Sequence, residues 1–113
     1  MEDTTEIKRN IYQILKTIPN VAVFQASPNI QITLPCIIFT TYSIDPTYEL
    51  AGEYAYRDIK IIIDIYAKTS KECWQLFDKC VQKMHILGYR NTNSRDLNID
   101  KDARVNAEFE TII

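Results

Sequence analysis

Four side chains could serve as a metal ligand, general base or nucleophile: the single histidine, His85, and the cysteines Cys36, Cys73 and Cys80. His85 lies inside a predicted helix, where one imidazole is more often a surface residue than a metal ligand or general base. Cys73 and Cys80 are seven residues apart on that helix, which suits core thiols and not a CxxC motif. Cys36 lies within a predicted strand with no histidine near it in the sequence, which disfavours a nucleophile.

Motifs for phosphate binding or paired carboxylates are absent from the sequence. The chain has only two glycines, Gly52 and Gly88, so neither a P-loop nor a GxGxxG motif can be present. Asp58 and Asp64 share one face of a predicted strand but lie about 20 Å apart on it, too far to act on one substrate atom. We therefore predict that the protein is not an enzyme and uses no cofactor or metal.

Tyrosines gather in and around the predicted strands, at Tyr42, Tyr48, Tyr54, Tyr56 and Tyr66. Such a set could stack against single-stranded nucleic acid. Because Arg and Lys are not interleaved with them, and because the net charge is −2, packing between strands and at interfaces is the better interpretation.

The length of 113 residues suits one domain, residues 1–113, with its own core. No apolar run approaches the roughly 20 residues that span a bilayer. The first ten residues, MEDTTEIKRN, lack the apolar segment of a signal peptide, so we expect the protein to remain in the cytoplasm where it is made.

Two amphipathic helices are predicted. The first covers about residues 4–18, with Asp3 as its cap and an apolar stripe of Ile7, Ile11, Ile14 and Ile18, with Leu15 beside it. The second begins after Thr69, which forms a capping box with Glu72, and Gly88 is placed to end it. Its apolar stripe consists of Cys73, Leu76, Phe77, Cys80, Met84 and Leu87.

Strands are predicted at about 21–24, 34–44, 55–66 and 104–113, with a further short one possible at 97–99 and a polar loop at 89–96. We expect Asp45-Pro46-Thr47 to break the second strand, and the long connection after it to be a protruding β-arm or a functional loop. The prediction is a single α+β domain with an antiparallel sheet of about four strands and two helices on one face, in the order α-β-β-β-α-β.

In the third strand, Ile59, Ile61, Ile63 and Ile65 fall on one face and are predicted to be core. Ile62 interrupts the charged opposite face. A single exposed isoleucine needs no explanation, but contact with another subunit would also account for it.

The order of these patterns resembles that of the tail-completion proteins of long-tailed bacteriophages, also called tail terminator or tail-to-head joining proteins. The resemblance covers roughly residues 6–88. It consists of the first helix, the extended Leu34-Pro35 segment before an apolar strand, and the strand end Asp64-Ile65-Tyr66-Ala67 followed by a helix.

That resemblance implies a structural protein of the virion tail or neck, assembled in the host cytoplasm. The protein would form a homo-oligomeric ring, commonly a hexamer, at the head-proximal end of the tail tube. There it would stop tube polymerisation and join the tube to the head-tail connector or stopper. DNA would pass through the ring without sequence-specific binding, and no membrane is involved.

A ring requires apolar residues on outward faces. The candidates for a subunit or tube interface are Tyr48, Leu50, Tyr54, Tyr56, Ile62 and Ile112. Asp45, Glu49 and Glu53 are candidates for an acidic lumen that repels DNA phosphates, although carboxylates at these positions would equally keep the surface soluble.

Two alternatives remain open on the sequence alone. One is another neck component, a stopper or adaptor between portal and tail, with the same size and the same need for a ring. The other is a small cytosolic ligand-binding domain or enzyme, which would require a pocket with convergent polar groups.

Overall fold

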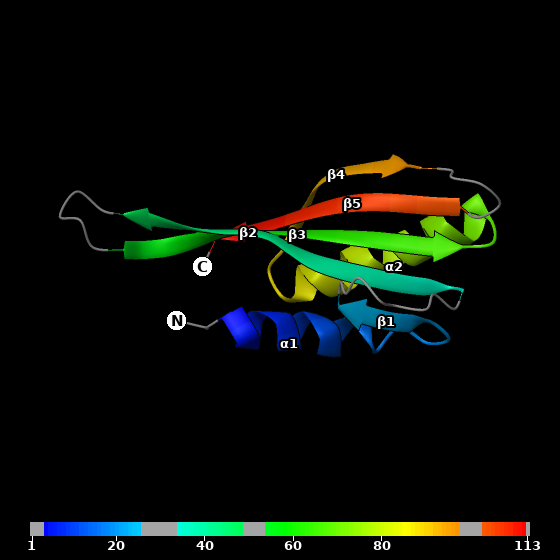
Figure 1. Ribbon diagram of the computed structural model, residues 1–113, viewed down its shortest axis with the longest axis horizontal. Helices are drawn as coiled ribbons and strands as arrows, with labels where there is room; N and C mark the ends of the chain where they lie inside the picture. Colours follow the sequence, from blue (N-terminus) through cyan, green and yellow to red (C-terminus); the bar gives the residue numbers. More distant parts are fainter. Residues whose placement is uncertain (1–3, 26–33, 49–53, 98–102, 113) are drawn as a thin grey trace.

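The structure, a computed structural model, describes residues 4–25, 34–48, 54–97 and 103–112. Its elements follow in the order α-β-β-β-α-β-β (Figure 1). The helices are α1 (Thr4–Leu15) and α2 (Ser70–Ile86). The strands are β1 (Ala22–Gln25), β2 (Cys36–Tyr48), β3 (Tyr54–Ala67), β4 (Arg90–Asp96) and β5 (Ala103–Ile112).

The strands form one mixed sheet in the order β1-β2-β3-β5-β4. β1 runs parallel to β2, with Ala22 opposite Cys36, and all other neighbours are antiparallel. The α+β class is confirmed, whereas the prediction of a purely antiparallel sheet of about four strands is wrong. Alternation of side chains identifies a strand but is the same for either strand direction, so it could not reveal that β1 is parallel.

β4 occupies the stretch that was predicted to be a polar loop. It forms an outer edge of the sheet and is made of exposed and half-buried residues, so it carries no apolar alternation. Backbone pairing with β5 holds it, together with a hydrogen bond of 2.9 Å that the Asn91 side-chain amide donates to the Glu108 carbonyl. The short strand predicted at 97–99 is not found at Leu97, and residues 98 and 99 lie outside the described residues.

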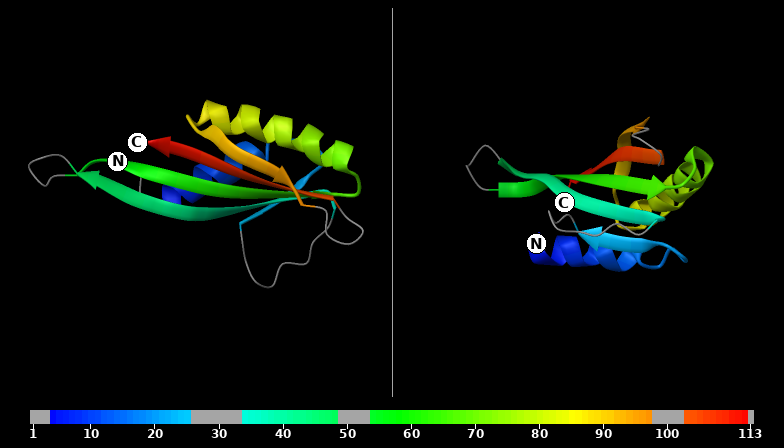
Figure 2. Two further views of the ribbon diagram at one scale, coloured as in Figure 1. Left: turned by 90° about the horizontal axis from the view of Figure 1, so that it is seen from above. Right: turned by 45° about the vertical axis from the view of Figure 1, so that its right-hand side comes forward.

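Both helices pack on the same face of the sheet, as predicted (Figure 2). The amide of Glu72 donates to the Thr69 hydroxyl over 3.2 Å, which confirms Thr69 as the cap of α2. At the other end Gly88 has a φ of +88°, and the amides of Gly88 and Tyr89 donate to the carbonyls of His85 and Met84. This Schellman arrangement requires a left-handed residue at the position predicted for glycine.

α1 ends at Leu15, earlier than predicted, and the predicted cap Asp3 lies outside the described residues. The chain then tightens, because the amides of Thr17 and Ile18 bond to carbonyls three residues back. This turn returns Ile18 to the core, while Ile14 is only half-buried.

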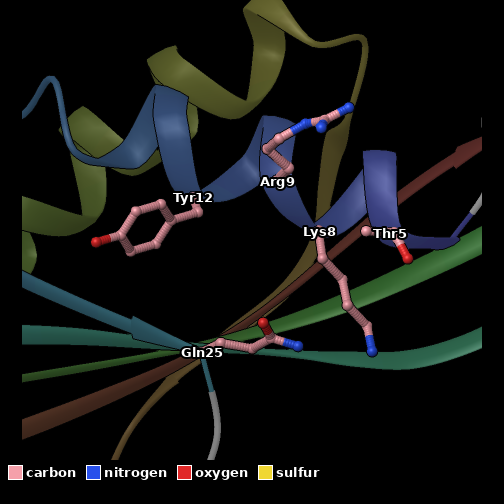
Figure 3. Close-up of a pocket in the computed structure, with 5 residues that line it drawn as sticks. All are labelled: Thr5, Lys8, Arg9, Tyr12 and Gln25. Atoms are coloured by element: carbon pink, nitrogen blue, oxygen red, sulfur yellow. The ribbon is translucent and has the colours of Figure 1, made fainter.

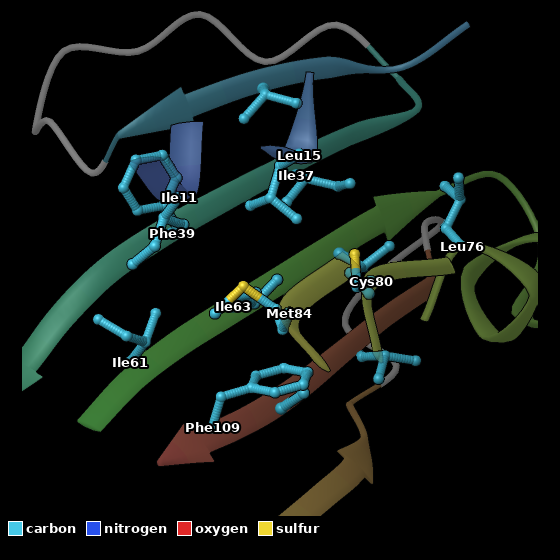
Figure 4. Packing of buried hydrophobic residues seen from close by; sticks show 14 of the residues in the cluster. Ile11, Leu15, Ile37, Phe39, Ile61, Ile63, Leu76, Cys80, Met84 and Phe109 are labelled. Atoms are coloured by element: carbon cyan, nitrogen blue, oxygen red, sulfur yellow. The ribbon is translucent and has the colours of Figure 1, made fainter. Parts of the chain in front are cut away.

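The core lies between the helices and the sheet (Figure 4). All four odd-numbered isoleucines of β3 are fully buried, as predicted. Ile63 lies between Phe39 of β2 and Ala107 of β5 in the register. From the helices, Leu15 and Met84 complete the packing with no exposed surface.

Candidate functional site

A two-stranded arm projects from one end of the sheet (Figure 1). β2 and β3 pair from Cys36–Tyr66 to Tyr48–Tyr54, whereas β5 reaches β3 only as far as Asp58. The arm gives the molecule a length of 53 Å against 26 and 22 Å in the other directions. We define the arm as residues 45–58.

The predicted break at Asp45-Pro46-Thr47 is therefore wrong, and the alternative of a protruding β-arm is confirmed where the backbone is described. Pro46 lies opposite Arg57 within the ladder. Proline is tolerated there because the described part of β1 pairs with β2 only as far as Phe39, so Pro46 lies where β2 has β3 on one side.

The aromatic candidates for an interface fall in the arm. Tyr48 pairs with Tyr54, and Tyr56 pairs with Thr47, across the two strands. Their side chains, and Leu50 entirely, lie outside the described residues. The structure thus brings these tyrosines together along the backbone, and their role in an interface stays a prediction.

The candidate lumen residues belong to the same arm. Asp45 pairs with Asp58 in the backbone register, while Glu49 and Glu53 lie outside the described residues. The sequence between Asp45 and Asp58 places these four carboxylates beside a single cation, Arg57. The arm consequently carries a net negative charge.

Ile62 lies on the sheet face opposite the helices, which we call the open face. It is half-buried there, between Thr40 of β2 and Glu108 of β5. Ile112 pairs with Asp58, about 13 Å along the strand from Ile62 at the usual rise per residue. The same rise separates Ile62 from Tyr56 by about 20 Å, and Ile112 lies between them at about 7 Å from Tyr56, so the candidates are spread along β3.

The open face holds further half-buried apolar side chains. Phe24 of β1 lies opposite Ile38 of β2 in the register, and Tyr66 lies opposite Cys36. The apolar character of β2 on this face follows from its sequence, but Phe24 was not singled out because its strand is only four residues long. A sheet face that is exposed to solvent usually carries polar side chains. The open face is thus more apolar than such a face.

A polar cluster that the sequence did not indicate lies beside them. Asp64 Oδ1 accepts hydrogen bonds from Arg104 Nε at 3.1 Å, Arg104 Nη2 at 2.9 Å and Asn106 Nδ2 at 2.8 Å. The Arg104 guanidinium also lies 5.4 Å from the centre of the Tyr66 ring. Burial raises the pKa of Tyr66, and the nearby Arg104 charge opposes this effect. These bonds fix the carboxylate as a tie between β3 and β5.

Cys73 and Cys80 are core thiols, as predicted, whereas Cys36 is buried outside the core cluster, opposite Tyr66 in the register. Cys36, Cys73 and Cys80 have no exposed surface. Burial, with a smaller effect of Cys73, raises the pKa of Cys36 to about 11, and burial raises that of Cys80 to about 12. The Cys73 thiol donates to the Ala103 carbonyl over 3.2 Å, and burial raises its pKa as well. His85 is exposed on α2, which agrees with a surface residue.

A cleft of about 420 Å³ opens between α1 and the end of β1 (Figure 3). The described residues that line it are Thr5, Lys8, Arg9, Tyr12 and Gln25. The four helical residues are spaced by three or four positions, which places them on one side of α1. This spacing of polar residues on α1 was the sequence signal from which the cleft could have been predicted. It was missed because the side of a helix opposite an apolar stripe is normally an ordinary solvated face.

The described residues contain neither a metal-binding cluster nor a membrane-spanning helix. Within residues 4–25, 34–48, 54–97 and 103–112, no group of three or more His, Cys, Asp or Glu side chains could hold a metal ion. In the same part of the chain, no helix is both long and apolar enough to cross a membrane.

Comparison with known proteins gives a weak structural likeness. No family model and no curated protein matches the sequence. A solved sheath/tube terminator of an extracellular contractile injection system, PVC, in its extended state, aligns with a TM-score of 0.46 and 6% identity. The alignment covers all of this chain and 57% of that one. A likeness at this level carries no argument about function.

Proposed function

We propose that this protein is a phage tail terminator that forms a ring at the head-proximal end of the tail tube. The ring stops polymerisation of the tube and joins it to the head-tail connector or stopper. DNA passes through it without sequence-specific contacts. The partners are further copies of the chain, the tail tube protein and the connector.

The observation that carries this proposal is the arm. A two-stranded ribbon is marginally stable in water on its own, because neither of its faces is buried in a core. Among the described residues, the part of the arm formed by 45–48 and 54–57 has no third strand beside it. A ribbon of this kind gains stability when it lies against another molecule, as a subunit or tube contact would provide.

The open face supports the same conclusion. Ile62, Ile38 and Phe24 are half-buried side chains on a face that neither helix covers. Apolar side chains on an outward face are typical of surfaces that meet a partner. A ring needs different patches on each subunit, and the open face is a surface separate from the arm that could take part in its contacts.

The sequence motif shared with tail-completion proteins has a structural role in this fold. Asp64 is tied to Arg104 of β5, Tyr66 packs against the same guanidinium, and Ala67 is fully buried where β3 leads to α2. The motif therefore holds the end of the central strand in place. A structural role of this kind agrees with the sequence, in which no catalytic or ligand-binding motif was found.

Tail length provides the test. Deletion of the gene should produce particles with abnormally long or unfinished tails in electron micrographs, and purified protein should bind to the ends of isolated tail tubes. Tails of normal length in the deletion, together with failure to bind tubes, would refute the proposal. Filled heads that leak DNA, with normal tails, would instead identify a stopper between portal and tail.

A further inference from the structure

The cleft beside α1 is basic. Lys8 extends from α1 toward the strands, and Gln25 projects from the end of β1 below it (Figure 3). Arg9 lines the same cleft and lies 4.0 Å from the Glu6 carboxylate, with more than half of its side chain exposed. The ammonium of Lys16 lies 5.2 Å from the centre of the Tyr12 ring. Lys8 and Arg9 therefore line the cleft, Lys16 lies against the Tyr12 ring, and among the described residues the Glu6 carboxylate lies near Arg9.

The cleft lies where β1 stops and β2 continues. Gln25 is the last residue of β1 and lies opposite Phe39, after which β2 runs on to Tyr48. Among the described residues no strand pairs with that outer edge of β2 beyond Phe39. In general, the edge of a sheet beside a helix can hold an extended segment from another molecule by backbone hydrogen bonds.

The arm has the complementary charge. Between Asp45 and Asp58 it carries four carboxylates and one guanidinium, and it contains the aromatic residues Tyr48, Tyr54 and Tyr56. Carboxylates suit Lys8 and Arg9, and tyrosine side chains suit a cleft that is lined in part by Tyr12. A cleft of about 420 Å³ has room for a few side chains, such as those at the end of a ribbon.

An arm cannot fill the cleft of its own subunit. Nine residues of paired strand separate Phe39, at the level of Gln25, from Tyr48. At the usual rise this places the described end of the arm about 30 Å from the cleft. Because β2 and β3 stay paired up to Tyr48 and Tyr54, the arm does not fold back.

We propose that the basic cleft of one subunit accepts the acidic arm of a second copy of this chain. Donor and acceptor are different surfaces, so the contact is heterologous and each subunit can bind one neighbour with each surface. Repetition of this contact with a closing rotation gives a ring. The inference rests on the proposed function and names the contact by which its subunits would join.

A charge exchange tests the contact. One full-length variant carries K8E and R9E, and the other carries E49K and E53K. Each variant alone gives the cleft and the arm charges of the same sign, which repel each other. We therefore expect self-association at low ionic strength to weaken by at least about tenfold relative to the wild-type chain. A matched control, K71E with K79E, changes the charge equally on exposed positions of α2 and should associate like the wild type.

Mixing the two variants supplies the decisive readout. Each acidic cleft then meets a basic arm and each basic cleft meets an acidic arm, so association should return in the mixture and fall again with added salt. Sedimentation velocity over a concentration series measures this, and circular dichroism of each variant verifies that it is folded.

The inference is overturned by three results: variants that associate like the wild type, a mixture that does not recover, or a wild-type chain that stays monomeric throughout the series. Failure of the proposed function is a separate result, because normal tail length in a gene deletion would exclude a terminator whatever the subunits do in solution. If a ring persists in the charge variants, the arm–cleft contact is excluded, but the proposed terminator function remains possible with subunits joined through another interface.

Discussion

Substituting aspartate at Ile63 and at its neighbour Ile62 compares the two faces of the central strand. The residues are adjacent in β3, but Ile63 is fully buried beneath the helices and Ile62 is half-buried on the open face. We expect Ile63→Asp to abolish folding, and Ile62→Asp to leave the monomer folded while it weakens self-association.

The cost at Ile63 follows from its surroundings, Phe39 on one side and Ala107 on the other. Loss of a buried isoleucine side chain costs about 2–5 kcal/mol. A carboxyl kept neutral there at pH 7 must raise its pKa by at least about three units, which adds roughly 4 kcal/mol. The sum is at least about 6 kcal/mol, comparable to the whole stability of a small domain, about 5–15 kcal/mol.

The cost at Ile62 is smaller, because the new carboxylate reaches water. It loses part of an apolar contact and lies opposite Glu108, and a directly opposed like charge costs up to about 1 kcal/mol. A total of about 1–2 kcal/mol lowers the melting temperature by roughly 5–15 °C in a domain of this size. Circular dichroism melts and sedimentation velocity measure the two effects.

An Ile62→Asp chain that is unfolded at room temperature would refute this reasoning, since it would make Ile62 part of the core. A folded Ile62→Asp chain that associates like the wild type would retain the assignment of faces but remove Ile62 from the subunit interface. A folded Ile63→Asp chain would contradict the burial itself.

Three further outcomes follow from local contacts. Thr69→Ala removes the acceptor for the Glu72 amide and should lower the free energy of unfolding in urea by about 1 kcal/mol, with Thr69→Ser close to wild type. Thr41→Val should raise that free energy by about 1 kcal/mol, because the buried Thr41 hydroxyl has no hydrogen-bond partner within the part of the chain described; a loss would indicate a partner for it. Since burial raises the pKa of Cys36 to about 11 and of Cys80 to about 12 from 9.0, their contribution to stability is complete below pH 9 and declines as the pH rises through those values. A thiol reagent at pH 8 should therefore react only upon unfolding, and rapid reaction of the folded chain would contradict the burial of these thiols.

Sequence patterns predict best where a single element determines the outcome. The limits of α2 follow from Thr69 and Gly88, because a cap hydroxyl and a left-handed residue act within one turn of the helix. The faces of β3 follow from isoleucine at every odd-numbered position from 59 to 65, with Ile62 as the one interruption of the other face. Both predictions depend on interactions between residues that are close in the sequence.

The errors arise where pairing with a distant strand determines the structure. β4 has no apolar alternation and exists because β5 offers it a ladder, 17 residues away at the Asn91–Glu108 contact. A proline would break a strand in the interior of a sheet, but Pro46 lies on the arm, where the described ladder pairs it with Arg57 of β3 and the strand continues to Tyr48. Neither context is visible in the residues themselves.

The candidate interface shows a further limit. Ile62 is its one member whose burial the structure describes; it is half-buried in a single copy of the chain, and the proposed contact would add a second copy. When β3 is considered alone, Ile62 is an apolar residue on an otherwise charged face, with no apparent reason for its position. In the sheet its neighbours are Thr40 and Glu108, and the apolar pair Phe24 and Ile38 lies on the same face. The face is therefore mixed and not simply solvated, and near the end of β3 the Asp64 carboxylate on it is hydrogen-bonded to Arg104. A face that combines hydrogen-bonded polar groups with half-buried apolar side chains is the kind of surface that the proposed ring would use, because it can meet either water or a partner.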